Sequence, residues 1–463
     1  MDRRFGPIRH HIPRATTDFS LGDQYVRALF KLYPRSSDVP LRDHYKMICE
    51  TIPSEILCEI FQFLCDEPIS LHVLDNSSCF GQFPWAVGQV CKRWRDEFLS
   101  YPHLWTSLSL RHYPTDILGV DRLHEMSRRT LLYLERSERL PLTITVHTAS
   151  IETFPRTTWK LLLSCSGRWE RANLTLSHET PLLDLLRCNL PIVKSLKLHA
   201  VLTYSSYLLL MLYNPFTSAP RLTEVDLLGR FVGLAFPWSQ LTKVKISFLD
   251  HGVPLRCTML EAILSQLQNV EEIRVGNVNV KNDLPDNRPF HVRLASLRLL
   301  AVPTYPFEIL RRIEAPSLEH LWVDWPFVYK QHYSLGFTEE LSFFIRRSSC
   351  HIRRLTLQVG ECRLLLSIMK ILPSVEELCI NTMIFGSGTF FAEHITQMND
   401  GVCLPNLRKL EVRCLRGRRD DDELMATTSH LLEMRSGQSR LISVSREDVP
   451  LQPTMVRLSM LFK

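Results

Sequence analysis

The sequence lacks several features that whole classes of protein require. Its longest uninterrupted apolar run covers only residues 207–213, far short of the ~20 residues that cross a bilayer as a helix. The N-terminus lacks the apolar core of a secretory signal peptide. None of the 13 cysteines forms a Cys-x-x-Cys pair, a spacing typical of structural zinc sites. These absences argue against a membrane-spanning chain, a secreted disulfide scaffold and a structural metal, and they predict a protein of the cytoplasm, the nucleus or both.

Sequence motifs of common active sites are also absent. The chain has no Gly-x-Ser-x-Gly elbow, no Gly-x-x-x-x-Gly-Lys-Ser/Thr phosphate loop, no His-Glu-x-x-His and no Gly-x-Gly-x-x-Gly. A net charge of +6 over 463 residues is a weak signal for nucleic acid. The sequence therefore predicts a chain that is not an enzyme, that uses no cofactor or metal, and that binds neither nucleic acid nor membrane.

Leucine is what the sequence has in excess. There are 74 leucines, and 57 of them follow residue 139. With 45% hydrophobic residues the chain can form a packed core. Its length allows about two to four domains, or one domain followed by a long repeat array. The first residues show no sustained periodicity, so we expect a flexible leader over residues 1–45.

Two helical patterns follow this leader. Thr51 is an N-cap candidate and Pro53 lies in the first turn, as is common where a helix begins. Apolar residues then recur every three or four positions as far as Leu64, which predicts an amphipathic helix. A second helical pattern covers residues 83–99, and residues 102–105 close the segment.

These residues resemble the F-box family. The matching motifs are Ile52-Pro53-Ser54-Glu55-Ile56-Leu57, Ile60-Phe61, Phe63-Leu64, Val90-Cys91-Lys92-Arg93-Trp94 and Leu104-Trp105. Ile52 stands where the family usually has leucine, which keeps the apolar volume, and the connection from Leu64 to Val90 is longer than the family commonly has. The resemblance implies a three-helix domain that docks on the Skp adaptor of a cullin-RING ubiquitin ligase.

The resemblance also implies which side chains dock on Skp or hold the small domain together. They are Ile52, Pro53, Ile56, Leu57, Ile60, Phe61, Leu64, Val90, Cys91, Trp94, Leu104 and Trp105. The sequence does not separate the two roles. The periodicity alone also fits an apolar stripe that only packs in the core of its own domain.

The leucine-rich remainder repeats one short phrase, apolar-x-x-apolar-x-apolar. Its nine copies are Val193-Leu196-Leu198, Leu222-Val225-Leu227, Leu241-Val244-Ile246, Val270-Ile273-Val275, Leu297-Leu300-Val302, Leu318-Leu321-Val323, Ile352-Leu355-Leu357, Val375-Leu378-Ile380 and Leu407-Leu410-Val412. Successive copies start 19 to 34 residues apart, which centres on the size of a leucine-rich repeat. Each copy predicts a strand with one buried face, and stacked copies would share one core. The same pattern also fits unrelated apolar strands of an α/β domain.

Three further phrases look like those of a large group of fungal F-box proteins with degenerate repeats. They are Leu134-Glu-Arg-Ser137, Ser166-Gly-Arg-Trp169 and Phe344-Ile-Arg-Arg-Ser348. This looser resemblance extends over about residues 50–415.

The fold class predicted in this way is α/β, with an N-terminal three-helix F-box followed by an irregular leucine-rich-repeat solenoid of strands and helices. The predicted boundaries are 1–45 for the leader, 46–110 for the F-box domain, 111–139 for a connecting helix and 140–463 for the substrate-binding array. The implied function is that of a substrate-recognition adaptor of an SCF-type (Skp–cullin–F-box) ubiquitin ligase, whose repeats hold an unidentified target protein. The alternative is a non-catalytic protein-binding scaffold that acts outside ubiquitin transfer.

Overall fold

The computed structural model divides the chain into two units. The first unit contains Met1–Ile69 and Asp75–Trp105, and the second contains Ser70–Leu74 and Thr106–Lys463. The residues that the structure describes are 52–64, 69–72, 90–112, 120–148, 156–176, 184–185, 188–200, 215–229, 235–247, 255–276, 280–281, 291–303, 308–324, 334–359, 363–382, 404–415, 439–447 and 455–462. The predicted leader over 1–45 lies outside these residues.

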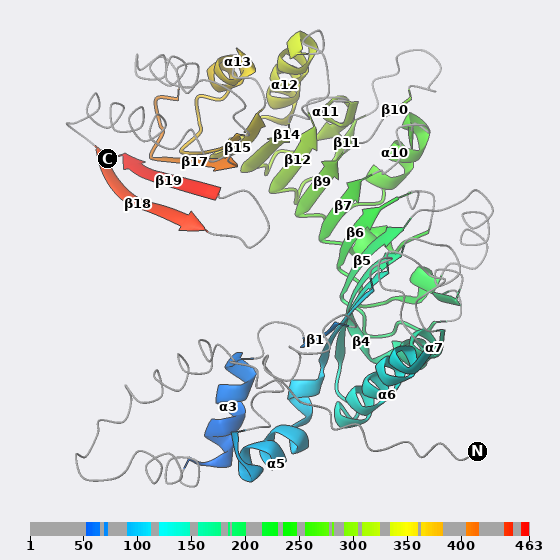
Figure 1. The fold of residues 1–463 in the computed structure, drawn as a ribbon. Coiled ribbons are helices and arrows are strands. Elements are labelled where there is room, and N and C mark those ends of the chain that lie inside the picture. Colours follow the sequence, from blue (N-terminus) through cyan, green and yellow to red (C-terminus); the bar gives the residue numbers. More distant parts are fainter. Residues whose placement is uncertain are drawn as a thin grey trace, which may run out of the picture. The chain divides into compact units, whose positions relative to one another are not determined.

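The described part of the first unit is helical (Figure 1). α3 covers Ser54–Leu64, α5 covers Lys92–Ser100, and a 3₁₀ helix, η1, covers Pro102–Trp105. α5 begins after an extended Cys91, whose sulfur accepts a hydrogen bond from the backbone N–H of Trp94 at 3.4 Å. Much of the second helix predicted over residues 83–99 lies outside the described residues.

The second unit is built on one sheet of 15 strands, and its helices lie along one side of that sheet (Figure 1). In chain order the strands are β1 (Ile69–His72), β2 (Ser107–His112), β3 (Leu142–Thr148), β4 (Trp169–Leu176), β5 (Ser195–Ala200), β6 (Glu224–Leu228), β7 (Lys243–Ser247), β9 (Glu272–Gly276), β12 (Leu299–Pro303), β14 (His320–Asp324), β15 (Arg354–Val359), β16 (Glu377–Thr382), β17 (Lys409–Leu415), β18 (Ser439–Glu447) and β19 (Met455–Phe462). Two short pairs stand apart from it, β8 (Leu255–Arg256) with β10 (Val280–Lys281) and β11 (Val292–Arg293) with β13 (Ile313–Glu314).

Helices and 3₁₀ turns connect these strands. The α-helices are α6 (Val120–Arg136), α7 (Arg156–Ser164), α10 (Cys257–Leu264), α11 (Glu308–Arg312), α12 (Ser334–Ser348) and α13 (Arg363–Ile371). The 3₁₀ helices are η2 (Ser166–Arg168), η3 (Pro215–Ser218) and η4 (Trp238–Gln240). The connecting helix expected within 111–139 corresponds to α6, which belongs to the second unit.

Neighbouring strands of the large sheet follow one another in chain order as far as β17, which is followed by β19 and then β18. From β2 to β17 the neighbours pair in parallel, and β19 and β18 then close the sheet as antiparallel strands. The register places apolar residues in rows, so that Leu196 pairs with Val225 and Leu355 pairs with Leu378. The last two residues of all nine apolar phrases lie in these strands, which confirms each predicted strand.

The step from one strand to the next repeats the same hydrogen bonds. The carbonyl oxygen of Glu271 accepts from the backbone N–H groups of Arg298 and Leu299, at 2.8 and 3.0 Å. The carbonyl oxygen of Arg298 accepts in the same way from Glu319 and His320, at 3.0 and 2.9 Å. Each strand therefore starts from a shared acceptor on the strand before it, which satisfies backbone donors that burial would otherwise leave unpaired.

The predicted fold class is wrong. The described part of the first unit has two α-helices and one 3₁₀ helix where a three-helix F-box was predicted. The second unit is one large α/β sheet, parallel from β2 to β17 and covered by helices on one side, where a leucine-rich-repeat solenoid was predicted. The repeated phrase specifies a strand with one buried face. It carries no information about the segments that return the chain from one strand to the next.

Arg168, at the end of η2, holds the C-terminal end of α6. Its guanidinium donates to the carbonyl oxygens of Leu140 at 3.0 Å, Ser137 at 3.1 Å and Leu134 at 3.5 Å, and to the hydroxyl of Ser137 at 2.7 Å. Burial lowers the pKa of Arg168 from its usual value. A cation is favoured at this end of a helix, where backbone carbonyls lack partners within the helix.

Replacing this cation will destabilise the second unit. We expect Arg168→Met to lower the free energy of unfolding by about 2–4 kcal/mol, since it leaves several carbonyl oxygens without a charged donor. Arg128→Met on α6 is the matched control, because Arg128 is exposed and pairs with Glu125 one turn away. Its replacement should leave the free energy of unfolding close to that of the wild type. Urea denaturation of the full chain measures the free energy of unfolding of both variants. If both variants lost the same stability, the contacts of Arg168 with the end of α6 would not be what stabilises the second unit.

Candidate functional site

Aromatic side chains form the core of the first unit. Phe61 on α3 is fully buried, and its ring centroid lies 5.4 Å from that of Trp94 and 6.2 Å from that of Phe98, edge-on to both. The ring of Phe98 lies 5.0 Å from that of Trp105, whose Nε1 donates to the Phe98 carbonyl oxygen at 3.2 Å. Buried aromatic pairs of this geometry add stability beyond the area that they bury. The core therefore holds α3 against α5 and η1.

Two polar contacts hold the start of α3 on α5. Arg93 Nη2 donates to the carbonyl oxygen of Ile52 at 2.6 Å. Ser54 Oγ donates to a carboxylate oxygen of Glu97 at 2.5 Å. Together with the aromatic core, these contacts determine which face of α3 is turned outward.

The outward face of α3 is apolar. Phe63 is 76% exposed and Ile56 is 46% exposed, while Pro53 is exposed and Ile60 is partly exposed. Residues 56, 60 and 63 are spaced four and three positions apart, so they share one helical face. We call Pro53, Ile56, Ile60 and Phe63 the apolar stripe. Val90, before α5, is 51% exposed. Of the five exposed large apolar side chains in the described residues, three lie in this small unit, a concentration typical of surfaces that bind other proteins.

The structure shows which of the predicted site residues are buried in the small domain and which are exposed on its surface. The predicted site residues that form the core are Ile52, Leu57, Phe61, Trp94, Leu104 and Trp105. Those with exposed side chains are Pro53, Ile56 and Val90, and those partly exposed are Ile60 and Cys91. The side chain of Leu64 lies outside the described residues. Half of the predicted site residues therefore belong to the hydrophobic core of the first unit.

Two residues of this unit were not among the predicted site residues. Phe63 is the most exposed of the large apolar side chains described, and Phe98 is one of the most buried. Both had a signal in the sequence. Phe63 follows Ile56 by seven positions, and Phe98 follows Trp94 by four, so each extends a helical face that was already recognised.

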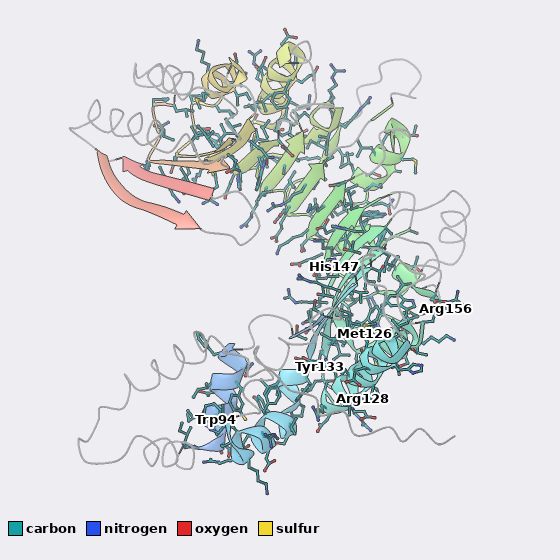
Figure 2. The ribbon with its side chains drawn as sticks, viewed as in Figure 1. Trp94, Met126, Arg128, Tyr133, His147 and Arg156 are labelled. Carbon is teal, nitrogen blue, oxygen red and sulfur yellow. The ribbon has the colours of Figure 1, made fainter. Side chains whose placement is uncertain are left out.

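The sheet of the second unit has one apolar and one polar face. In the strands whose side chains the structure describes, buried apolar residues alternate with residues on the opposite side of the sheet, which form what we call the polar face (Figure 2). Near its middle, Arg274 on β9 lies over Trp322 on β14, with 5.2 Å between the guanidinium carbon and the ring centroid. Ala301 of β12 lies between them, in register with both residues, and the two large side chains cover it, so that it is only 9% exposed. Arginine and tryptophan are enriched among the residues that dominate protein interfaces.

His320 lies on the polar face beside this pair. Its Nε2 is 2.9 Å from the hydroxyl oxygen of Thr356. Burial, followed by the positive charges of Arg354 and Arg274, lowers the pKa of His320 to about 4. Folding thus keeps this imidazole neutral over a pH range in which the unfolded chain would protonate it.

His320 will make the stability of the second unit depend on pH. Because its pKa is lower in the folded chain than the value of roughly 6.5 in an unfolded chain, the stability that it contributes is present above pH ~6.5 and is lost as the pH falls toward 4. The free energy of unfolding of the wild type should therefore fall between pH 7.5 and 4.5. In His320→Gln, which cannot be protonated, this fall should be smaller by about 1–2 kcal/mol. Urea denaturation at intervals from pH 7.5 to 4.5 measures it. Parallel curves for the variant and the wild type would contradict the expectation.

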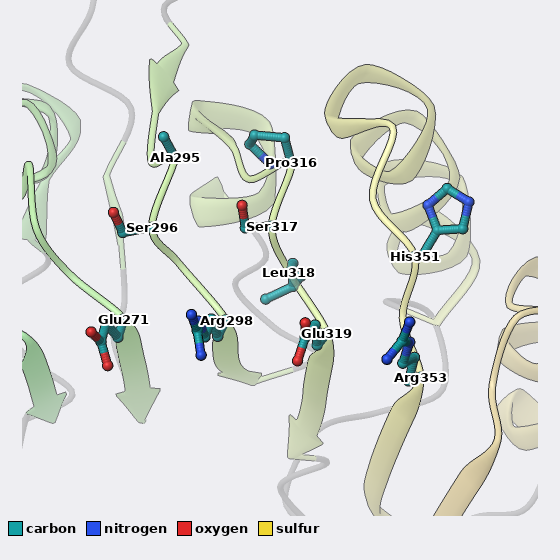
Figure 3. Close-up of a pocket in the computed structure, with 10 residues that line it drawn as sticks. All are labelled: Glu271, Ala295, Ser296, Arg298, Pro316, Ser317, Leu318, Glu319, His351 and Arg353. Carbon is teal, nitrogen blue, oxygen red and sulfur yellow. The ribbon is translucent and has the colours of Figure 1, made fainter.

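An open cavity of about 480 Å³ lies where strands β9, β12, β14 and β15 begin (Figure 3). Glu271, Arg298, Glu319 and Arg353 line it side by side, with charges that alternate from strand to strand (Figure 3). Alternation of this kind offsets the repulsion of like charges on neighbouring strands. These four charged side chains therefore stabilise the sheet through attraction between neighbouring strands. Because their charges balance, the cavity favours neither an anion nor a cation as ligand.

Within the described ranges no three His, Cys, Asp or Glu side chains gather in a way that could hold a metal ion. None of the helices that the structure describes combines the length and the apolar character that crossing a bilayer requires.

No family model matches the chain, and no curated protein matches it in sequence. Among solved structures the chain is similar to Sp1610 of Streptococcus pneumoniae, a proposed tRNA (m1A22) methyltransferase, with 14% identity and a TM-score of 0.19. The match covers 36% of this chain and 63% of that chain, so the chain spans less than two thirds of the protein that it matches.

The fold corrects the prediction that the chain is not an enzyme, because a large, mostly parallel α/β sheet with helices is an architecture that supports many enzyme activities. The prediction had depended on missing sequence motifs, and such motifs cover only a few families of enzymes. We therefore withdraw it. At a TM-score of 0.19 the match assigns neither a reaction nor a site to this chain.

Proposed function

We propose that this chain is a substrate-recognition adaptor of an SCF-type ubiquitin ligase. Its first unit docks on the Skp adaptor and, through Skp, on a cullin. The observation that carries the proposal is the apolar stripe, which lies on the outward face of a helix whose other face is packed against an aromatic core. The F-box motifs within residues 52–105 support the identity of the partner.

The stripe has the form of a helix face that packs on a partner. Large apolar side chains gain roughly 1.5–3 kcal/mol each when they are fully buried, so Ile56 and Phe63 are the largest sources of affinity in the described part of the unit. Glu55, Glu59 and Gln62 are exposed on the same helix. These polar side chains lie off the stripe and limit it to one narrow contact.

The second unit holds the target protein in this proposal. Ubiquitin transfer then depends on proximity, because the adaptor raises the effective concentration of target lysines near the thioester of a ubiquitin-conjugating enzyme. The chain acts in the cytoplasm, the nucleus or both.

Binding of purified components tests the proposal. The full chain is mixed with recombinant Skp adaptor and analysed by size-exclusion chromatography and calorimetry, and we expect a stable one-to-one complex. Affinity purification with mass spectrometry then identifies the bound target, and a reconstituted cullin-RING ligase with that target should transfer ubiquitin to it. Failure to bind Skp would overturn the proposal. A Skp complex that transfers no ubiquitin would instead indicate a protein-binding scaffold.

A further inference from the structure

The polar face of the sheet is electrically asymmetric. On strands β2 to β7 its lysines and arginines are Arg111, Arg171, Lys197, Lys243 and Lys245, and its carboxylates are Glu224 and Asp226. On strands β9 to β17 the described side chains are Arg274, Arg354 and Lys409 against Glu272, Asp324, Glu377 and Glu411. Among the side chains that the structure describes, the positive surplus thus lies on strands β2 to β7. We call its five lysines and arginines the basic patch.

The two carboxylates within the basic patch offset only part of its charge. Glu224 pairs with Lys243, with 2.8 Å between the carboxylate oxygen and Nζ. Asp226 is shared by three groups, with Lys245 Nζ at 3.2 Å, His199 Nε2 at 3.3 Å and Lys197 Nζ at 4.0 Å. Burial acts to raise the pKa of Asp226, but hydrogen bonds from His199 and Lys245 lower it overall. One carboxylate can compensate only one positive charge, so the lysines beside it keep a net attraction for anions.

His147 on β3 responds to the same field. Its pKa is lowered, first by burial and then by the charges of Arg111, Lys197 and His199. The side chains of the basic patch are also accessible, with Lys243 52% and Lys245 46% exposed. The lysines can therefore reach a ligand on the polar face.

We propose that the basic patch binds an acidic segment of a partner protein, laid across strands β4 to β7 with its carboxylates on Arg171, Lys197, Lys243 and Lys245. This inference rests on the proposed function in one respect, that the segment belongs to the target protein. The recognition itself depends only on the second unit.

An acidic protein segment fits this surface better than a nucleic acid does. Glu224 and Asp226 interrupt the basic residues, and they would repel the continuous charge of a phosphate backbone. The residues of β2 to β7 that form the polar face include no Phe, Tyr or Trp, whereas surfaces that bind single strands stack bases on such rings. A peptide with separated carboxylates can place each of them on a cation and keep clear of the two acids.

Binding of a defined peptide tests the inference. The probe is a fluorescent peptide of alternating glutamate and serine, and its lysine counterpart and a single-stranded oligouridine serve for comparison. Fluorescence anisotropy is measured with the full chain at several salt concentrations, in the absence of Skp. We expect the acidic peptide to bind, the lysine peptide not to bind, and affinity to fall as salt rises.

Matched variants locate the site. Lys197→Gln with Lys245→Gln should weaken binding of the acidic peptide about tenfold. Lys160→Gln with Lys370→Gln removes the same charge from exposed positions on helices α7 and α13, and it should leave binding within about twofold of the wild type. Thermal melting checks that both variants fold.

Three results would overturn the inference. They are no binding of the acidic peptide, equal weakening by both double variants, and tighter binding of oligouridine that the Lys197 and Lys245 variant abolishes. The last would indicate a nucleic-acid surface. Because Skp is absent from this assay, none of these outcomes can be confused with a failure of Skp docking.

Discussion

A full chain carrying Phe63→Asp will bind the Skp adaptor at least about a hundredfold more weakly than the wild type. Phe63 is the most exposed large apolar side chain described, so in the proposed complex it would lose more solvent contact than any other residue of the stripe. An aspartate at its position would place an unpaired carboxylate in an apolar contact, which costs several kcal/mol. Ile56→Asp should act in the same direction with a smaller effect, because Ile56 is already half covered. Isothermal titration calorimetry measures both.

Gln62→Asp is the matched control for this prediction. Gln62 is the neighbour of Phe63 in the chain and is also exposed, but it lies off the stripe. The same new charge on the same helix should therefore change Skp affinity by no more than about threefold. If Gln62→Asp and Phe63→Asp weakened binding equally, the loss would be a general effect of charge on α3 and the stripe would not be the docking surface.

Single strands, and helices such as α3 and α6, were the parts of this fold that could be predicted from the sequence. A strand with one buried face carries its own signal, since two apolar residues two positions apart must point the same way. This holds for all nine phrases, from Leu196 and Leu198 on β5 to Leu410 and Val412 on β17. The fold class could not be predicted in this way, because parallel order and helix placement depend on contacts between segments distant in sequence.

The candidate site shows the same limit at the scale of one helix. Motif and spacing located the residues of the first unit but could not say which of them face outward. Ile56 and Leu57 are adjacent in the same motif, yet one is half exposed and the other is fully buried. What separates them is the orientation of α3, set by Phe61 against Trp94 and by Arg93 on the Ile52 carbonyl. Those contacts join residues about 30 to 40 positions apart, and no local pattern encodes them.

All three phrases that looked like those of fungal F-box proteins have a structural explanation. The Ser137 of one phrase and the Arg168 of another are joined by a hydrogen bond of 2.7 Å that helps to cap α6. Arg347, within a third phrase, donates in a similar way to the carbonyl oxygens of Leu310 and Ile313. The arginines of these phrases therefore mark helix ends whose carbonyl oxygens are satisfied by a partly buried cation.

Phe61→Ala will unfold the first unit and leave the second unit folded. Phe61 is fully buried and contacts Trp94 and Phe98, so its truncation leaves a cavity in the centre of a small core. Such a change costs about 3–5 kcal/mol, which is about as much as a core of this size supplies in total. Hydrogen exchange measured by mass spectrometry should show lost protection in α3 and α5 and unchanged protection in strands β3 to β7.

Phe63→Ala is the control for the loss of an aromatic ring, two positions away on the same helix. Because Phe63 is largely exposed, its truncation should change stability by less than about 0.5 kcal/mol and leave α3 protected. Phe61→Ala and Phe63→Asp should then both lose Skp binding, but only Phe61→Ala should lose protection of α3. This difference distinguishes a residue that makes the surface possible from one that belongs to it. If Phe63→Asp lost protection as well, its effect on binding would reflect unfolding, and the exposed side of α3 would have no demonstrated role in docking.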